Sequence, residues 1–340
     1  MSSKKNNLKF AIVGATGMVG TAFLNLLQER DYHPIEIRLF ASDASAGKKI
    51  PYGDQLLPVQ KLSEGCFDGL DIVFFSSGDD ISKEWAPKAA KAGAFAIDNS
   101  AAFRMDPGTH LVVPEVNGDL LKGLKPQIIA NPNCSTIQLV VVMDILQRNF
   151  GVNTIKVSSY QAVSGAGLAA QEELLSHTKA FMHGETLPAK EFVHPIVFNC
   201  IPHIGSFADN GFTSEENKIM QETRKILRLP KVRVSAFTVR VPVMNSHAET
   251  VWVTLDKNVS RDQITSVLKS AVGIVVQDDP KKSDYPMQNE VSGKDPVYVG
   301  RIHQDMDDPM TWLMWIVSDN IKKGAALNGL QIAEQIFDIN

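Results

Sequence analysis

Apolar positions in the first 133 residues follow two alternating patterns. Short runs that are apolar throughout are separated by stretches in which apolar residues recur at helical spacing. The runs predict strands at 8–13, 35–41, 71–78, 95–100 and 127–130, and the spaced stretches predict helices at 21–30 and 81–92. Strands without an apolar and polar alternation are typical of a parallel sheet that helices cover on both faces. This region is therefore expected to form an α/β domain.

Beyond residue 134 the pattern changes to longer β-type runs. Strands are predicted at 154–163, 232–243, 249–255, 297–302 and 311–318, with helices at about 168–182, 215–228 and 260–272. This order is typical of an α+β domain with a mixed, largely antiparallel sheet and helices on one side. The last helix, at 324–333, is assigned to the first domain. Since 340 residues exceed the size of one core, two domains are predicted, 1–133 plus 324–340 and 134–323.

Composition narrows the class of protein. The net charge is −4 and the lysines and arginines are scattered, which argues against a nucleic-acid surface. The N-terminus is polar and no apolar run reaches membrane-spanning length, so no membrane partner is expected. The three cysteines, Cys66, Cys134 and Cys200, form no CxxC pair or metal knuckle. This usage suits the cytoplasm, and no metal is expected.

A glycine-rich turn follows the first predicted strand and opens the first helix. The segment 14–20 reads GATGMVG, in which Gly14 allows a tight turn, Gly17 lets the backbone approach a pyrophosphate and Gly20 lets the helix pack on the strand. N–H groups at the helix start would hold the phosphates. The predicted cofactor-binding residues here are Gly14, Thr16, Gly17, Met18, Val19 and Gly20. The alternative is a glycine turn in an α/β protein that binds no nucleotide.

The loop after the second strand bears on the choice between NADP and NAD. It reads SDASAGKK from Ser42 to Lys49. Serine hydroxyls and lysines favour a 2′-phosphate, whereas Asp43 favours a free 2′-hydroxyl. Because two serines and two cations outnumber one carboxylate, NADP is predicted, with Ser42, Ala44 and Ser45 as binding residues. Asp43 and Lys48 could equally be solvated loop charges.

Cys134 stands where a short strand and loop are expected to turn into an apolar helix. The segment 131–136 reads NPNCST, and apolar residues recur at helical spacing after it. N–H groups and the positive end of a helix dipole stabilise a thiolate, which is the nucleophilic form of cysteine. The sequence therefore indicates a catalytic thiol. The alternative is a small buried residue, which is the commoner role of a free cysteine.

Seven segments, in the order of a known family, resemble bacterial aspartate-β-semialdehyde dehydrogenases. They are GATGMVG, DNSAAFR, NPNCSTIQ, YQAVSGAG, SEENK, RVPVMNSH and GAALNGLQIAE. The resemblance implies an NADPH-dependent reductive dephosphorylation of L-4-aspartyl phosphate to L-aspartate 4-semialdehyde through a cysteine thioester. This step belongs to lysine, threonine, methionine and diaminopimelate biosynthesis. It also implies an N-terminal Rossmann-like domain and a substrate and dimerisation domain like that of glyceraldehyde-3-phosphate dehydrogenase.

The resemblance also implies roles for individual residues. Cys134 would be the nucleophile, Asn133 would help to orient the site, and Gln161 would position the acyl group. His247 resembles the general acid and base, a task suited to a side chain that titrates near neutrality. Without the family match, Gln161 reads as an ordinary strand residue, and the remaining histidines compete with His247.

Substrate and nicotinamide contacts follow from the same segments. Arg240 would clamp the α-carboxylate, Glu215 would meet the α-ammonium, and Lys218 and Arg104 would bind the phosphate. The alternatives are a helix-surface ion pair for Glu215 with Lys218 and an exposed loop charge for Arg104. Four residues match the family's nicotinamide contacts: Ser77, Ser164, Gly165 and Asn328.

One departure weakens the prediction of cofactor preference. The loop often reads SARSAGK in relatives, whereas Asp43-Ala44 here replaces Ala-Arg. We therefore expect NADP, with weaker discrimination against NAD and with Lys48 or Lys49 compensating for the missing arginine.

Two other functions remain open at this stage. N-acetyl-γ-glutamyl-phosphate reductase and phosphorylating glyceraldehyde-3-phosphate dehydrogenase share the mechanism, but Glu215 favours a substrate with a free amine. The second alternative, from another class, is a non-catalytic paralogue that senses a dinucleotide. The intact Cys134, Gln161 and His247 argue against it.

A homodimer or homotetramer is expected, because the open face of the second sheet needs a cover. Trp312 and Trp315 fit that interface or the core.

Overall fold

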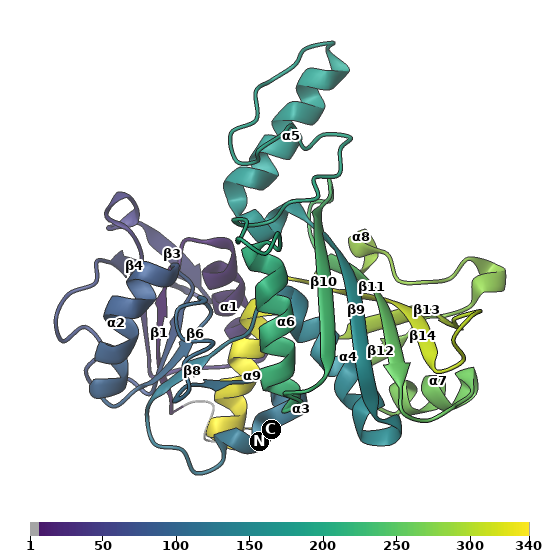
Figure 1. Ribbon diagram of the computed structural model, residues 1–340. Coiled ribbons are helices and arrows are strands. Elements are labelled where there is room, and N and C mark those ends of the chain that lie inside the picture. Colours follow the sequence, from purple (N-terminus) through teal and green to yellow (C-terminus); the bar gives the residue numbers. More distant parts are fainter. Residues whose placement is uncertain (1–6, 340) are drawn as a thin grey trace. The chain divides into compact units, whose positions relative to one another are not determined.

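The computed structural model describes residues 7–339, which form two compact units (Figure 1). The chain passes from the first unit to the second between Asn133 and Cys134 and returns between Gly324 and Ala325. Each unit contains one sheet. Within residues 7–339, no helix has the length and the apolar character needed to cross a bilayer.

The first unit contains an eight-stranded sheet with the order β3-β4-β2-β1-β5-β6-β8-β7. The strands are β1 (Lys9–Val13), β2 (Glu36–Phe40), β3 (Lys49–Tyr52), β4 (Gln55–Gln60), β5 (Ile72–Phe75), β6 (Phe95–Asp98), β7 (His110–Leu111) and β8 (Ile128–Ala130). Neighbouring strands are parallel except for the edge pair of β3 and β4. The five predicted strands are all present. Strands β3 and β4 were not predicted, because their side chains are mostly exposed and each strand contains a proline. The short β7 was not predicted either.

Helices cover both faces of this sheet, as its apolar strands require. Along β1, Phe10 belongs to a core shared with Phe23 of α1 (Met18–Glu29) and Leu330 of α9 (Leu327–Ile336). Val13 belongs to a second core, with Ala86 of α2 (Asp79–Lys91). The unit also contains the short helix α3 (Pro114–Asn117). Because α1 begins at Met18, three residues earlier than expected, Gly20 lies within its first turn.

The second unit contains a six-stranded sheet with the order β10-β9-β11-β14-β13-β12. The strands are β9 (Val152–Gln161), β10 (Arg233–Arg240), β11 (His247–Leu255), β12 (Ile274–Val276), β13 (Val297–Gln304) and β14 (Thr311–Ser318). The outer pairs, β10 with β9 and β12 with β13, are parallel, and the three central pairs are antiparallel. The expected mixed, largely antiparallel sheet is confirmed.

One face of the second sheet is covered by helices. Helix α4 (Cys134–Phe150) packs on β9, β11 and β14, α6 (Ser214–Leu227) packs on β10, and α7 (Arg261–Lys269) packs on β12 and β13. Helix α5 (Leu168–Met182) extends away from the sheet at the top of Figure 1, and the short α8 (Gln288–Val291) lies near β14.

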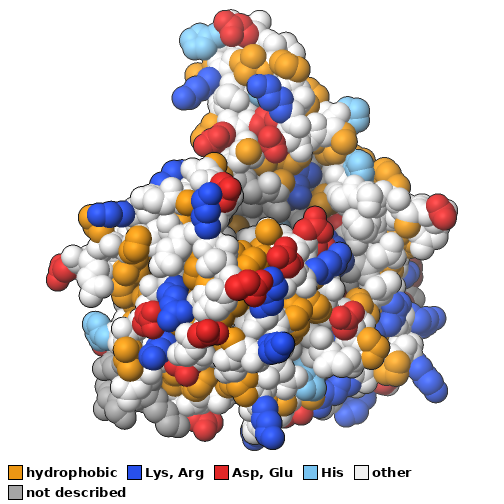
Figure 2. Space-filling model, turned by 90° about the vertical axis from the view of Figure 1, so that its left-hand side faces the viewer, with side chains coloured by type: hydrophobic (Ala, Val, Ile, Leu, Met, Phe, Trp, Pro, Cys, Tyr) orange, Lys and Arg blue, Asp and Glu red, His pale blue; other side chains and the backbone are white. Residues whose placement is uncertain are grey.

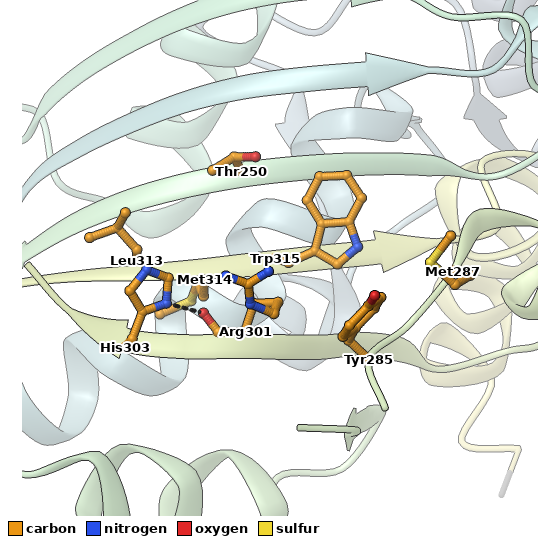
Figure 3. Close-up of a pocket in the computed structure, with 8 residues that line it drawn as sticks. All are labelled: Thr250, Tyr285, Met287, Arg301, His303, Leu313, Met314 and Trp315. Atoms are coloured by element: carbon orange, nitrogen blue, oxygen red, sulfur yellow. Dashed lines mark hydrogen bonds between the residues drawn. The ribbon is translucent and has the colours of Figure 1, made fainter. Parts of the chain in front are cut away.

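Among residues 7–339, helices cover the opposite face of the second sheet only in part: Val291 of the short α8 packs there against Ala248 of β11 and Val317 of β14. Residues of β11 alternate, with Val251 and Val253 buried toward α4 and Thr250 and Trp252 half-exposed on the other side. Trp315 of β14 also lies on this open face and donates from Nε1 to the Pro286 carbonyl at 2.9 Å, whereas Trp312 is buried in the core. A shallow pocket of about 330 Å³ opens here (Figure 3). It is lined by Thr250, Tyr285, Met287, Arg301, His303, Leu313, Met314 and Trp315.

Charged side chains of both signs are interspersed over the surface drawn in Figure 2. A nucleic-acid surface would instead present a continuous basic stripe. The described surface on this side shows no continuous stripe of lysines and arginines.

Candidate active site

Five of the predicted residues meet at one edge of the second sheet. Gln161 ends β9 and pairs in register with Arg240, which ends the parallel strand β10. His247 begins β11, which runs antiparallel to β9 and so starts where β9 ends. Cys134 begins α4, and Glu215 lies in the first turn of α6. The sheet register thus gathers residues that are far apart in the sequence.

The position of Cys134 favours a thiolate. It is the first residue of α4, where the helix dipole is positive, and its charge interacts with that of Arg240. Gly324 lies close beside it, since a Cβ built on Gly324 would stand 2.9 Å from the Cβ of Cys134. The side chain is half-buried, so the thiol is not enclosed in packed hydrocarbon.

His247 is a neutral hydrogen-bond donor in this structure. Its Nδ1 accepts the N–H of Ala162 at 3.1 Å, so the ring proton must be on Nε2, and Nε2 makes no hydrogen bond. Complete burial, together with the positive charge of Arg240, lowers the pKa of His247 to about 3. The sequence predicted a general acid and base at His247 that titrates near neutrality. The structure differs, because the imidazolium would be both desolvated and repelled.

Arg240 and Glu215 form the charged part of the site. Arg240 is buried and donates from Nη1 to the Ala162 carbonyl at 2.6 Å, which fixes one edge of the guanidinium. Burial lowers the pKa of Arg240, whereas Glu215 and Cys134 act in the opposite direction. An arginine remains charged even so. The site therefore presents a buried cation beside a carboxylate.

Glu215 is oriented by two neighbours. Gln161 donates from Nε2 to Glu215 Oε1 at 3.1 Å, and Lys218 Nζ lies 3.6 Å from Glu215 Oε2. A capping box between Thr213 and Glu216 fixes the start of α6 and thereby the position of Glu215. The ion pair of the alternative reading exists, but Glu215 is buried rather than on a helix surface.

Gly165 lies against the side chains of Arg240 and His247. A Cβ at this position would stand 2.7 Å from Arg240 Nη1 and 3.0 Å from His247 Nε2. From the sequence, Gly165 was predicted only as a cofactor contact. The structure adds a steric reason for glycine, which is that any side chain would fill the space in front of the His247 donor.

We expect the substitution Gly165→Ala to lower kcat/KM by about 10- to 100-fold, because overpacking of this kind displaces neighbours at a cost of about 1–3 kcal/mol. Steady-state kinetics with both substrates would measure the effect. Gly108→Ala is the matched control, since a Cβ at Gly108 would meet nothing within 4 Å. Equal kinetics for the two variants would contradict the steric argument.

Three predicted residues of the first unit are buried and support loops. Arg104 donates from Nε to the Asn131 carbonyl at 3.0 Å and from Nη2 to the Asn99 carbonyl at 2.9 Å, so the reading as an exposed loop charge is wrong. Asn328 donates to the Val112 carbonyl at 3.0 Å and to Asn131 Oδ1 at 2.7 Å. Asn133 is also buried. Their substrate and cofactor contacts remain predictions.

The glycine turn has the geometry that a dinucleotide requires. Gly14 has φ of 88°, and a Cβ on it would lie 2.8 Å from the Ser76 carbonyl oxygen. Gly17 caps α1 without a side-chain hydrogen bond to the helix, so backbone N–H groups of the first turn can meet a phosphate. Met18, Val19 and Gly20 form that turn, and Ser77 follows the adjacent strand β5.

The loop predicted to distinguish NADP from NAD, residues 42–49, lies beside the glycine turn. Thr16 Oγ1 and Lys48 Nζ each lie 3.5 Å from Ser45 Oγ. Ser42 precedes the short 3-10 turn of Asp43–Ser45, and Ala44 is its middle residue. The carboxylate of Asp43 pairs with Lys61 at 3.1 Å. The carboxylate that would favour NAD is thus paired with a cation. Lys49, the second lysine of this segment, is the first residue of the edge strand β3.

Ser164 belongs to the second unit and is part of a polar network there. Its Oγ donates to Asn245 Oδ1 at 3.0 Å and accepts from Asn320 Nδ2 at 3.0 Å. The predicted nicotinamide contacts are therefore divided between the two units, with Ser164 and Gly165 in one and Ser77 and Asn328 in the other.

Sequence reasoning missed two polar residues near the site, Glu249 and Gln138. Both are buried, on β11 and α4 respectively. The sequence contained a signal for Glu249. Side chains alternate between the two faces of a strand, so Glu249 lies on the same face as the buried residues Val251 and Val253 and must point to the core. Because the predicted strand began at Glu249, the face to which its side chain points was not considered.

Two family models match the chain, the NAD binding domain of semialdehyde dehydrogenases over residues 9–124 and their dimerisation domain over residues 143–323. Aspartate-semialdehyde dehydrogenase of Aquifex aeolicus is 48% identical over 329 residues, which are 96% of this chain and 97% of that protein. The chain belongs to the aspartate-semialdehyde dehydrogenase family. This membership confirms the resemblance carried by the seven segments.

Solved structures of the family have the same fold. The crystal structure of aspartate semialdehyde dehydrogenase II of Vibrio cholerae complexed with ASA is 40% identical, with a TM-score of 0.94 over 98% of both chains. The enzyme of Candida albicans with NADP is 27% identical, with a TM-score of 0.77 over 98% of this chain and 100% of that one. The fold class, a Rossmann-like NAD-binding domain with a dimerisation domain, is confirmed.

Proposed function

We propose that this enzyme reduces L-4-aspartyl phosphate to L-aspartate 4-semialdehyde with NADPH, releasing phosphate, in the cytoplasm. The observation that carries the proposal is the convergence of Cys134, Gln161, Glu215, Arg240 and His247 at one sheet edge. Such a set offers a nucleophile, a neutral donor, a cation and an anion, which match an amino acid with a reactive side-chain carbonyl.

The thiolate of Cys134 attacks the acyl carbon, and the bond from that carbon to the phosphate oxygen breaks. The resulting thioester accepts the hydride that bound NADPH supplies, and the thiohemiacetal then collapses to the aldehyde and releases the thiolate. Covalent catalysis replaces one difficult step by two easier ones. Arg240 interacts electrostatically with Cys134 and is available to stabilise the thiolate at each stage.

His247 acts on the acyl oxygen in this scheme. Its Nε2–H is the donor, because Nδ1 is held by Ala162. The oxygen gains negative charge when the thiolate attacks and again when hydride arrives, and a fixed donor in a buried site stabilises that charge. On collapse, the oxyanion of the thiohemiacetal re-forms the carbonyl bond as the thiolate leaves, and the proton stays on Nε2 throughout.

Substrate binding uses the charged pair. Arg240 binds the α-carboxylate, Glu215 binds the α-ammonium, and Gln161 holds the acyl group close to Cys134. A blocked amine has no charge for the buried Glu215 to meet, so N-acetyl-γ-glutamyl phosphate is disfavoured. Lys218 and Arg104 are proposed for the phosphate.

The test is the reverse reaction. Reduction of NADP by aspartate semialdehyde should depend on phosphate or arsenate, and N-acetylglutamate semialdehyde should not replace the substrate. Phosphate-independent turnover, or preference for the acetylated substrate, would refute the proposal. Binding of dinucleotide without turnover of either aldehyde would instead support the paralogue reading.

Lys48 is proposed to bind the 2′-phosphate of NADP together with Ser42 and Ser45. We expect Lys48→Ala to lower kcat/KM for NADP by about tenfold, the effect of losing one charge-assisted hydrogen bond, and to leave the value for NAD unchanged. Lys49→Ala is the control, because Lys49 lies in β3. A wild-type enzyme that clearly prefers NAD would contradict the NADP assignment itself.

A second copy of the chain is proposed to cover the open face of the second sheet, forming a homodimer that could pair further into a tetramer. The half-exposed Thr250, Trp252 and Trp315 form a continuous surface across β11 and β14, and the matched family model is a dimerisation domain. A subunit interface would bury these side chains as an apolar core.

Thr250→Arg should therefore weaken the dimer by at least about 100-fold, since it buries an unpaired charge in the interface. Sedimentation velocity over a range of concentrations measures the change. Val272→Arg, at an exposed position after α7, should leave assembly unaltered. A Thr250→Arg variant that sediments like wild type would place the interface elsewhere.

A further inference from the structure

A carboxyl group that the reaction scheme does not use is buried next to the active site. Glu249 is completely buried on β11. It stands two residues after His247, so both side chains point to the same face of the sheet. Neither of its carboxyl oxygens makes a hydrogen bond. Burying an ionised carboxylate without hydrogen-bond partners costs much free energy of folding. A buried glutamate in these surroundings therefore suggests either a neutral carboxyl or a function.

The nearest polar groups do not neutralise a charge on Glu249. The Gln138 amide of α4, whose Oε1 accepts from Ser318 Oγ at 2.8 Å, stabilises the charged form, but no well-aligned hydrogen bond joins the two side chains. Glu215 is a second carboxyl close enough to repel it. In the sheet register, the partners of Glu249 are Ser159 of β9 and Ile316 of β14, which do not titrate.

The two carboxyls differ in their surroundings, and this difference decides which one holds a proton. Glu215 accepts a hydrogen bond from Gln161, pairs with Lys218 and interacts with Arg240. Glu249 has none of these partners. When two adjacent buried carboxyls cannot both ionise, the one without donors and cations keeps the proton.

We propose that Glu249 is a positioning residue that carries a proton in the working enzyme and thereby leaves Glu215 as the ionised carboxyl beside Arg240. The proposal rests on the proposed function, because Glu215 is the group that meets the substrate ammonium there. A neutral Glu249 leaves Arg240 available to the α-carboxylate and to the thiolate of Cys134.

Loss of this proton should inhibit the reaction. A second buried negative charge would compete with the substrate carboxylate for Arg240, repel the phosphate and disfavour the thiolate of Cys134. Burial and the charge of Glu215 raise the pKa of Glu249 to about 8. The other titratable and charged groups at this edge are Cys134 on α4, Glu215 and Lys218 on α6, Arg240 on β10 and His247 on β11.

The first experiment compares pH profiles of kcat/KM for wild type, Glu249→Gln and Asp144→Asn. Wild type should lose about tenfold per pH unit above a one-proton step near pH 8. The amide in Glu249→Gln resembles the protonated acid, so activity at pH 7 should stay within about threefold of wild type while the alkaline step disappears. Asp144 is a buried carboxyl of α4 that pairs with Arg148 at 2.8 Å, and its variant should retain the step. An unaltered alkaline step in Glu249→Gln would overturn the positioning role.

The second experiment observes the proton without substrate. Infrared difference spectra of the whole enzyme should show a protonated-carboxyl band that titrates with the alkaline step, persists in Asp144→Asn and is missing in Glu249→Gln. If the glutamine variant fails to fold, the wild-type comparison still decides, because a band and an activity step with different midpoints would refute the proposal. An enzyme with the band but without turnover of aspartate semialdehyde would refute the proposed function alone.

Discussion

Replacement of Cys134 by alanine should lower kcat by at least about 10⁴-fold, because removing a covalent nucleophile removes both steps of the proposed route. The thiol lies at the start of α4 and interacts with Arg240, and alanine has no atom that could attack the acyl carbon in its place. The alanine occupies less space at a half-buried position, and the fold should be retained. Phosphate-dependent reduction of NADP by aspartate semialdehyde measures the loss.

A matched control is available in the same chain. Cys200 is exposed and lies outside the described site, so Cys200→Ala should keep wild-type activity. Mass spectrometry adds a direct readout, since wild type given aspartyl phosphate without cofactor should acquire an acyl group on Cys134. Undiminished turnover by Cys134→Ala would remove the covalent mechanism altogether.

Replacement of His247 by asparagine should lower kcat by about 10²- to 10⁴-fold, the range found when a positioned proton donor is lost. Asparagine can still accept the Ala162 N–H through its side-chain oxygen, but its amide is too short to reach the position of Nε2. Activity against substrate concentration should show the loss mainly in kcat, because the substrate carboxylate and ammonium still meet Arg240 and Glu215. His33→Asn is the control, since His33 is exposed in the first unit.

The pH dependence tests the state of this histidine as well. Its pKa is lowered to about 3 by burial and by Arg240, so the imidazole is neutral throughout the range in which the enzyme is assayed. The wild-type profile should therefore contain no step near pH 6.5, the ordinary value for histidine. A step there that vanishes in His247→Asn would show that the ring titrates, against the neutral-donor scheme.

The site concentrates buried polar groups that contribute little to the stability of the fold. Arg240, Glu215, His247 and Glu249 are all at least nine-tenths buried at one edge of a sheet. Buried charges and unsatisfied polar atoms oppose folding. Their presence at one place is what a binding site for a small zwitterionic substrate requires, and the apolar face of α4 against β9, β11 and β14 offsets their cost.

Elements that depend on near neighbours in the chain could be predicted closely. The helix at 168–182 and the strand at 311–318 have the predicted bounds, because helical spacing and an apolar run are local properties. Gly14 and the start of α4 at Cys134 were equally readable. The edge strands β3 and β4 were not, since their exposed side chains and prolines produce no apolar pattern.

The sequence by itself determined the two-domain organisation and the glycine turn, since these follow from periodicity and from a motif of adjacent residues. The proposed nucleophile and charged substrate ligands came from the resemblance of seven segments to a known family. Only the tertiary structure decided the protonation of His247, the steric role of Gly165 and the isolation of Glu249. Each of these depends on groups that the sheet register brings together from distant positions, such as Ala162 and His247, which are 85 residues apart. Burial and charge at a site are set by such neighbours, and no local pattern in the chain records them.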